Sequence, residues 1–264
     1  MTDTHEQEIE DKSEQAPVRR PKKRPVAIAE NIKDWIVEQG LQPGDRLPGE
    51  RELIGRFKAS KGTIREALKV LETQGLITTR TGPGGGTFVE ALSERRAMEL
   101  LGNYFFFRRP GIGDIYALRK LLEPELAASV VGRLAEQDFA RLERTMQIYA
   151  DPPRDLEEER RQRHAELDFH SILVDYCPNP VLAFQCRFLQ SMLRDLAICR
   201  KIYDTPNPDL RESGLTYQVR LLRALRRGEA EAARRIMYEH MCTAQRYMEE
   251  GEAIVQSRFL RVSD

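Results

Sequence analysis

Three short sequence blocks, close together and in a fixed order, constrain the fold of this 264-residue chain more than any other feature. The first covers residues 48–53, the second residues 60–68, and the third, which is rich in glycine, residues 82–89. The first two are typical of short helices separated by a tight turn, and the third is typical of a hairpin turn. Together they predict one compact unit made of helix, turn, helix and hairpin.

The residues around these blocks complete the pattern. A further helix is predicted to start near Val26, because apolar residues recur there on one helical face. Gly40 ends that helix, Ser60 is a candidate N-cap for the third helix, and Gly75 ends the third helix. Segments 76–80 and 87–89 are β-prone and predict the two strands of the hairpin. Residues 25–90 are therefore predicted to form a winged helix-turn-helix.

Basic and small residues occupy the positions where such a unit meets a nucleic acid. A helix N-terminus opened by hydroxyl and small residues can approach phosphate, and an arginine can pair bidentately with a guanine edge. A glycine-rich wing tip can lie against the DNA backbone without side-chain clashes. The alternative for any one arginine is an exposed ion pair with Glu50, Glu52 or Glu66. The predicted DNA contacts are Arg51, Ser60, Lys61, Thr63, Arg65, Gly84, Gly85 and Gly86.

The formal net charge of zero hides an uneven distribution. Residues 1–17 carry six acidic residues against one lysine, whereas residues 18–90 carry fourteen Lys or Arg against nine Asp or Glu. The basic surplus thus falls on the predicted DNA-binding unit. Residues 1–24 lack helical or strand periodicity and are predicted to be a disordered tail. The basic run at its end is either a solvated segment or an arm that reaches phosphate or the minor groove.

Composition narrows the class of protein. Hydrophobic residues make up 41% and charged residues 32% of the chain, as expected of a well-solvated helical protein. The chain has neither a long apolar run nor a secretion-type N-terminal pattern, so we expect a cytoplasmic protein with no membrane partner. Its four cysteines lack paired spacing and are expected to be reduced thiols in apolar surroundings.

The remaining two thirds of the chain predict a second, all-helical domain over residues 91–255, followed by a short tail at 256–264. Helical periodicity is interrupted only at Gly- and Pro-containing breaks, and no strand pattern stands out. The expected fold class is therefore mainly α, a winged helix-turn-helix followed by a helical bundle. The predicted helices cover 94–106, 114–133, 137–149, 155–176, 180–202, 209–226 and 229–252.

The three blocks resemble the GntR family of bacterial transcription factors, whose N-terminal domain carries a pattern close to LPxERELA…VSRxTVREAL…LxxxGL…GxGTFV. The resemblance covers residues 26–90 and implies a DNA-binding regulator rather than an enzyme. It also implies that Arg51, Lys61, Thr63, Arg65 and the wing glycines contact DNA. Two positions depart from the pattern. Lys61 stands where the family usually has Arg, and Gly62 where it usually has Pro or Thr, which implies an altered operator preference.

The helical domain is similar to the all-helical sensor domain, called FCD, of the family's FadR-type branch. The matching segments are residues 166–170 (ELDFH), Asn179-Pro180 and residues 224–240. Arg119 and Glu123 match the first sensor helix of the family. In many members an Asp and three His hold a divalent metal ion, and the effector carboxylate binds beside it.

The implied metal positions in this chain are Glu166, His170, Gln218 and His240. Glu is an acceptable ligand, but Gln offers only a weak, neutral carbonyl oxygen. Two alternatives stay open. Either a divalent ion such as zinc is held by the Glu and the two His, with Gln218 or water completing the site, or the same residues form a metal-free pocket of hydrogen-bonding groups.

An anionic effector would need a cationic partner, because guanidinium matches carboxylate bidentately. The candidate effector-binding residues are Arg119, Arg194, Arg200 and Tyr217. The sequence thus predicts a homodimeric regulator of an inverted-repeat operator, by default a repressor, controlled by a small carboxylate such as a sugar acid. The alternatives are an acyl-chain sensor, an architectural DNA binder without a ligand, and a metal-dependent enzyme.

Overall fold

The computed structural model describes residues 24–259, with side chains placed as far as Val255. The chain divides between Ser93 and Glu94 into two compact units. Arg24 is the first residue of a helix, and the rest of the predicted N-terminal tail lies outside the described residues. The last helix continues to Phe259, so residues 256–259, predicted as a tail, are helical.

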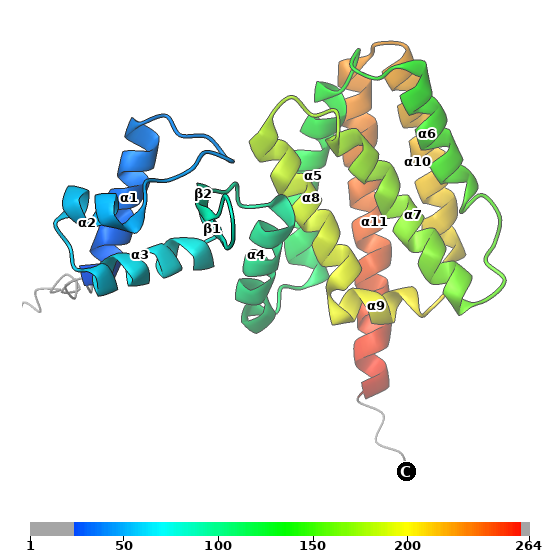
Figure 1. Cartoon of the computed structure of the whole chain (residues 1–264). Helices are drawn as coiled ribbons and strands as arrows, with labels where there is room; N and C mark the ends of the chain where they lie inside the picture. Colours follow the sequence, from blue (N-terminus) through cyan, green and yellow to red (C-terminus); the bar gives the residue numbers. More distant parts are fainter. Residues whose placement is uncertain (1–23, 260–264) are drawn as a thin grey trace, which may run out of the picture. The chain divides into compact units, whose positions relative to one another are not determined.

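The N-terminal unit is a winged helix-turn-helix, as the sequence predicted. Three helices precede an antiparallel hairpin in which Ile77 pairs with Val89 and Arg80 with Gly86 (Figure 1). The elements are α1 (Arg24–Glu38), α2 (Glu50–Phe57), α3 (Lys61–Thr73), β1 (Ile77–Arg80) and β2 (Gly86–Val89).

The core of this unit lies between α1, α2, α3 and the hairpin. Ile32, Leu53, Ile64 and Leu71 are fully buried, in agreement with the apolar helix faces read from the sequence. Gly75 follows α3 with a φ of 73°, where a side chain would be strained, and a Cβ there would lie 2.8 Å from the Leu92 side chain. A glycine is therefore required where the chain leaves α3 for β1.

The C-terminal unit is a helical bundle, which confirms the predicted fold class. The 30-residue helix α11 lies at its centre, packed along α5 and α10 (Figure 1). The helices are α4 (Glu94–Arg108), α5 (Ile112–Ser129), α6 (Glu136–Gln147), α7 (Leu156–Val174), α8 (Pro180–Asp195), α9 (Ala197–Tyr203), α10 (Pro208–Arg226) and α11 (Ala230–Phe259).

One predicted helix is wrong. Residues 180–202 were expected to form a single helix, but the backbone at Leu196 is extended, with a ψ of 133°, and separates α8 from α9. Neither Gly nor Pro marks this break, so the sequence offered no local signal for it. The consequence is that the short helix α9 turns and packs against α11, where Ile202 lies close to Gly251.

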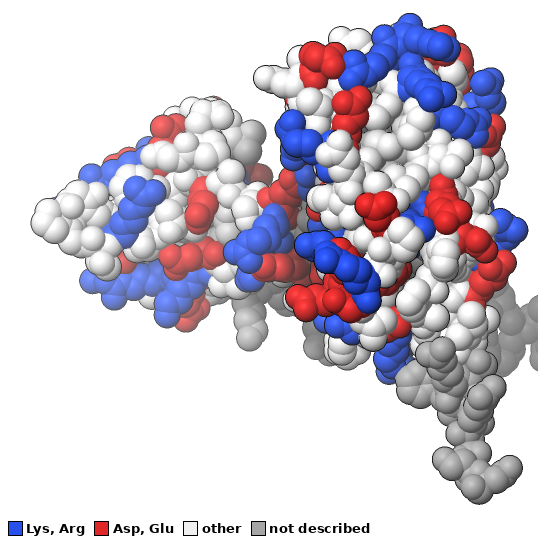
Figure 2. Space-filling view, turned by 90° about the vertical axis from the view of Figure 1, so that its right-hand side faces the viewer, with Lys and Arg blue, Asp and Glu red and all other residues white. Residues whose placement is uncertain are grey.

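The surface of the described residues carries mixed charge. On the face drawn in Figure 2, basic and acidic side chains lie beside one another without a patch of a single sign dominating it. Most of the ion pairs are exposed, and solvent screens such pairs, so they contribute little to stability. No helix within residues 24–259 is both long and apolar enough to cross a membrane.

Candidate functional site

The N-terminus of α3 is the first candidate site. The Ser60 side chain caps the helix by accepting a hydrogen bond from the Thr63 N–H at 3.2 Å, and the two hydroxyl oxygens lie 2.9 Å apart. Lys61 and Gly62 are exposed beside them. The first turn therefore combines hydroxyl groups, free helix N–H groups and a cation at one exposed point, an arrangement suited to an anion.

Arg65 and Arg51 supply further positive charge near this point. Both side chains are exposed, and the Arg65 Nε lies 2.7 Å from a carboxylate oxygen of Glu50. The hydrogen bond and the charge of Arg65 lower the pKa of Glu50. The ion-pair alternative raised from the sequence is thus present for Arg65. Because this pair is solvated, exchange of Glu50 for a DNA phosphate or base would cost little.

The wing is held by an arginine that the sequence did not single out. The Arg46 Nη2 donates a hydrogen bond of 2.7 Å to the carbonyl of Gly85. A Cβ at Gly85 would lie 2.5 Å from the Arg80 carbonyl oxygen, and Gly84 has a φ of 79°, so both glycines are needed for the turn itself. An isolated arginine before a helix gives no sequence signal for this role, which depends on the folded hairpin.

The second candidate site is a buried polar cluster within the helical bundle. The Glu123 carboxylate accepts from the Arg119 Nε at 2.6 Å with one oxygen and contacts the His170 Nδ1 at 2.5 Å with the other. All three residues are at most 2% exposed. Burial alone would raise the pKa of Glu123, but Arg119 and His170 outweigh it, and the net pKa lies below its ordinary value.

A second imidazole continues this cluster. The Nε2 atoms of His170 and His240 are 3.3 Å apart, and the two rings are stacked with an interplanar angle of 18°. The carboxylate of Glu123 faces the His170 Nδ1, so this nitrogen carries a proton, and one of the two Nε2 atoms donates to the other. Among the described residues, the His240 Nδ1 and the Arg119 Nη2 are buried without a hydrogen-bond partner.

A small cavity of about 20 Å³ adjoins the cluster, and Arg119, Glu166, His170 and His240 are among the residues that line it. This volume suits about one water molecule. Arg163, also on its wall, contacts Glu159 at 3.0 Å and Glu166 at 2.9 Å. A neighbouring pocket of about 100 Å³ shares three wall residues with it, namely Arg163, Tyr203 and Leu210.

The structure brings only part of the predicted sensor set together. Arg119, Glu166, His170 and His240 line the cavity, but Arg194 instead pairs with Asp168 at 2.6 Å and Arg200 is exposed. The Tyr217 ring contacts that of His240 at an interplanar angle of 36°, but Tyr217 is not on the cavity wall. The sequence missed Arg163 and Tyr116, because their place beside the cavity depends on how separate helices pack.

The donor set does not fit the implied metal ion. The Gln218 side-chain oxygen accepts a hydrogen bond from the buried Tyr149 hydroxyl and is not on the cavity wall. The described residues contain no group of three or more His, Cys, Asp or Glu side chains placed to hold an ion. Gln218 as a fourth ligand therefore stays a prediction, and in this structure its side-chain oxygen has another partner, the Tyr149 hydroxyl.

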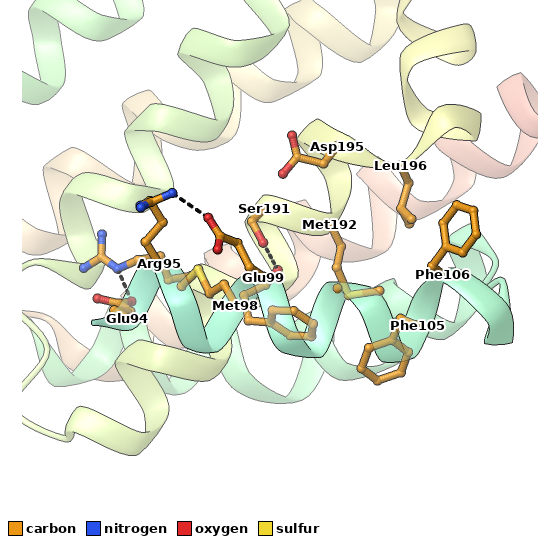
Figure 3. Close-up of a pocket in the computed structure, with 13 residues that line it drawn as sticks. Glu94, Arg95, Met98, Glu99, Phe105, Phe106, Ser191, Met192, Asp195 and Leu196 are labelled. Atoms are coloured by element: carbon orange, nitrogen blue, oxygen red, sulfur yellow. Dashed lines mark hydrogen bonds and ion pairs between the residues drawn. The ribbon is translucent and has the colours of Figure 1, made fainter. Parts of the chain in front are cut away.

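A larger hollow of about 680 Å³ lies between α4 and α8. Met98, Phe105, Phe106, Met192 and Leu196 line it, and an ion pair between Arg95 and Glu99 borders it (Figure 3). Helix α4 has no fully buried residue among those described. Apolar faces of this kind mark interaction surfaces more often than small-molecule sites with convergent polar groups.

Acidification should weaken the fold through His240. Burial lowers its pKa well below the ordinary value of about 6.5, His170 and Arg119 lower it further, and Glu123 opposes them. Because the unfolded chain then binds the proton more readily, this contribution is present above about pH 6.5 and is lost as pH falls. One pH unit below that point the loss is about 1.4 kcal/mol. Urea unfolding measures the free energy of unfolding at pH 7.5 and at pH 5.5. The difference between these two free energies should be smaller for His240→Gln than for the wild type, and equal differences would contradict this assignment.

Comparison with known proteins also indicates a DNA-binding regulator. Residues 26–89 match the family described as bacterial regulatory proteins, gntR family, and residues 114–243 match the FCD domain. The chain is 27% identical to the uncharacterized HTH-type transcriptional regulator YcbG of Bacillus subtilis, over 81% of this chain and 85% of that protein. It is 24% identical to the HTH-type transcriptional repressor NanR of Edwardsiella tarda, over 84% and 85% of the two chains. A solved Streptococcus agalactiae GntR structure covers 84% of this chain and 99% of its own at a TM-score of 0.52 and 21% identity, which supports the fold.

Proposed function

Because this chain belongs to the GntR family of bacterial transcriptional regulators and carries the FCD ligand-binding domain, we propose that it binds an inverted-repeat operator as a homodimer and responds to a small carboxylate. It is a regulator of transcription and not an enzyme, as its relatives are. The proposal therefore concerns the operator, the effector, the sign of control and the assembly.

The exposed N-terminus of α3 carries the DNA-binding part of the proposal. Its capped first turn presents Ser60, Lys61 and Thr63, and Arg65 follows half a turn later. In a helix-turn-helix these positions enter the major groove, while the wing lies along the backbone or the minor groove. Two such units related by a two-fold axis match a palindromic site.

Selection from a random duplex library, followed by gel shift at fixed salt, tests this part. We expect an enriched inverted repeat and at least a thousand-fold preference over unrelated duplex, as is typical of specific binding. Binding that shows no sequence preference and only a steep salt dependence would favour the architectural alternative.

The cavity beside Arg119 supports a small, polar, anionic effector. Arg119 is 2% exposed, and its Nη2 lacks a partner among the described residues, so a carboxylate there would satisfy a buried donor. The charged and imidazole groups around the cavity argue against an acyl chain, which would need an apolar wall. The adjoining pocket offers extra room if its shared wall moves.

Repression relieved by the effector is the proposed sign of control. The NanR relative is named a repressor, and an effector that binds one arrangement of the DNA-binding units better than another shifts their population. A reporter gene behind the selected operator should be silent with the regulator and active without it. Higher expression in the presence of the regulator would reverse this sign.

Exposed leucines on α5 are the proposed centre of the dimer contact. Leu118 and Leu121 lie one turn apart and are 48% and 66% exposed, and α4 adds the exposed Phe106 and Phe107. We expect Leu118→Asp/Leu121→Asp to be folded but monomeric in light scattering at micromolar concentration, because charge is disfavoured at the centre of an interface. Leu156→Asp/Val219→Asp, which changes two other exposed apolar residues, is the control and should remain dimeric. A dimeric Leu118/Leu121 variant would exclude this face.

A further inference from the structure

Gln218 and Tyr149 form a buried pair that bears on how the effector site works. Each side chain is 1% exposed, and the Tyr149 hydroxyl donates its hydrogen bond to the Gln218 oxygen. The oxygen is the only atom of a glutamine side chain that can ligate a metal ion, because its NH₂ group carries no available lone pair. The hydrogen bond thus holds the one potential ligand atom at this position against the Tyr149 hydroxyl.

The carboxylates near the cavity are also already neutralised. Both oxygens of Glu123 are used, one by Arg119 and the other by His170. Glu166 contacts the buried guanidinium of Arg163 at 2.9 Å. No carboxylate here is left as an uncompensated buried charge that would require a cation.

The two imidazoles contact each other through their Nε2 atoms. His170 is oriented by Glu123, and its Nε2 shares a hydrogen bond of 3.3 Å with the Nε2 of His240, so both Nε2 atoms already have a partner within the cluster. A metal ion would have to break this contact and the Arg163–Glu166 pair. It would gain two imidazoles and one carboxylate, without the fourth protein ligand that a closed site has.

We propose that the effector cavity of this regulator is complete without a metal ion, and that the glutamine at position 218, in place of an imidazole, is the feature that excludes one. The inference rests on the proposed effector function of the cavity and specifies its chemistry. The effector's anion meets the Arg119 guanidinium directly, and no divalent ion lies between them.

Metal content and thermal unfolding of the full-length protein test the inference. Wild-type protein purified without chelator should contain well under 0.1 zinc, nickel or manganese per chain, and its Tm should not change with 100 µM of each metal or with EDTA. Gln218→His should gain about one metal per chain and a Tm higher by several degrees, because binding to the native state stabilises it by mass action. Tyr149→Phe frees the amide without adding an imidazole, and should not gain metal.

Stoichiometric metal in the wild type, or a Tm that falls with EDTA, would overturn the inference whatever the variants do. A folded Gln218→His protein that binds no metal would overturn the role given to Gln218, and metal uptake by Tyr149→Phe would do so as well. The operator gel shift is made on the same samples. If the wild-type protein contains metal and still binds its operator, this inference is rejected and the proposed function stands. If the protein shows no specific DNA binding, the proposed function itself is rejected.

Discussion

Arg65→Ala should raise the dissociation constant for the selected operator by roughly 5- to 150-fold, the effect of losing about 1–3 kcal/mol of a base-edge contact. Arg65 is exposed on α3 beside the N-terminal turn, so its removal leaves the core of the unit unchanged. Its one described partner is the solvated Glu50, and loss of that pair should not alter folding. Fluorescence anisotropy with labelled operator at fixed salt measures the change.

Arg95→Ala is the matched control for this experiment. Arg95 is also exposed and also pairs with a glutamate, Glu99, but it lies on α4 of the other unit. The Arg95→Ala substitution removes the same charge from the chain and should change the affinity for the operator less than two-fold. If Arg65→Ala and Arg95→Ala had the same affinity for the operator, and the same affinity for unrelated DNA, α3 would not be the helix that recognises the operator sequence. A uniform loss for both kinds of DNA in Arg65→Ala would instead assign that residue to phosphate.

Glu123→Ala should destabilise the helical unit by roughly 3–5 kcal/mol, because it leaves the Arg119 guanidinium buried without its carboxylate. Arg119 and Glu123 are 2% and 0% exposed, so bulk solvent does not screen the charge that is left unpaired. For a domain of this size the cost corresponds to a Tm lower by about 6–20 °C. Calorimetry of the full-length protein gives the value directly.

Glu125→Ala, two residues further along α5, is the control. Glu125 pairs with Arg234 at 2.8 Å on the surface, so its removal should shift the Tm little. Adding Arg119→Met to Glu123→Ala should recover part of the stability, because it removes the unpaired charge. Equal effects of the two single variants would mean that the buried pair contributes no more than a surface pair.

The winged unit could be predicted almost completely because its signals are local. The glycine turn, the Ser60 cap and the apolar helix faces are all determined by residues a few positions apart, and each has its counterpart in the structure. The hydrogen bond between Arg46 and Gly85 joins residues 39 positions apart and could not be predicted from the spacing of residues in the sequence. Its existence depends on the folded hairpin.

The effector site was predictable only where one helix carries two of its residues. Glu166 and His170 share a face of α7, so their common place follows from helical period. The contact of Tyr149 with Gln218 joins the turn after α6 to α10, and it could not be inferred without the packing of the bundle. In the structure, the Gln218 oxygen that the sequence suggested as a metal ligand accepts a hydrogen bond from Tyr149 instead.

The small size of the cavity beside Arg119 has a consequence for sensitivity. A space of about 20 Å³ admits no metabolite, so the proposed effector would bind only the fraction of molecules in which the wall shared with the adjoining pocket, at Arg163, Tyr203 and Leu210, is open. The apparent dissociation constant is the intrinsic one divided by that fraction. Under the proposed function, the effector concentration at which transcription responds would therefore depend partly on how readily this wall opens, and α9 contributes Tyr203 to it. Evolution can retune this threshold through the α9–α11 packing, for example at Ile202 and Gly251, without altering any group that touches the effector.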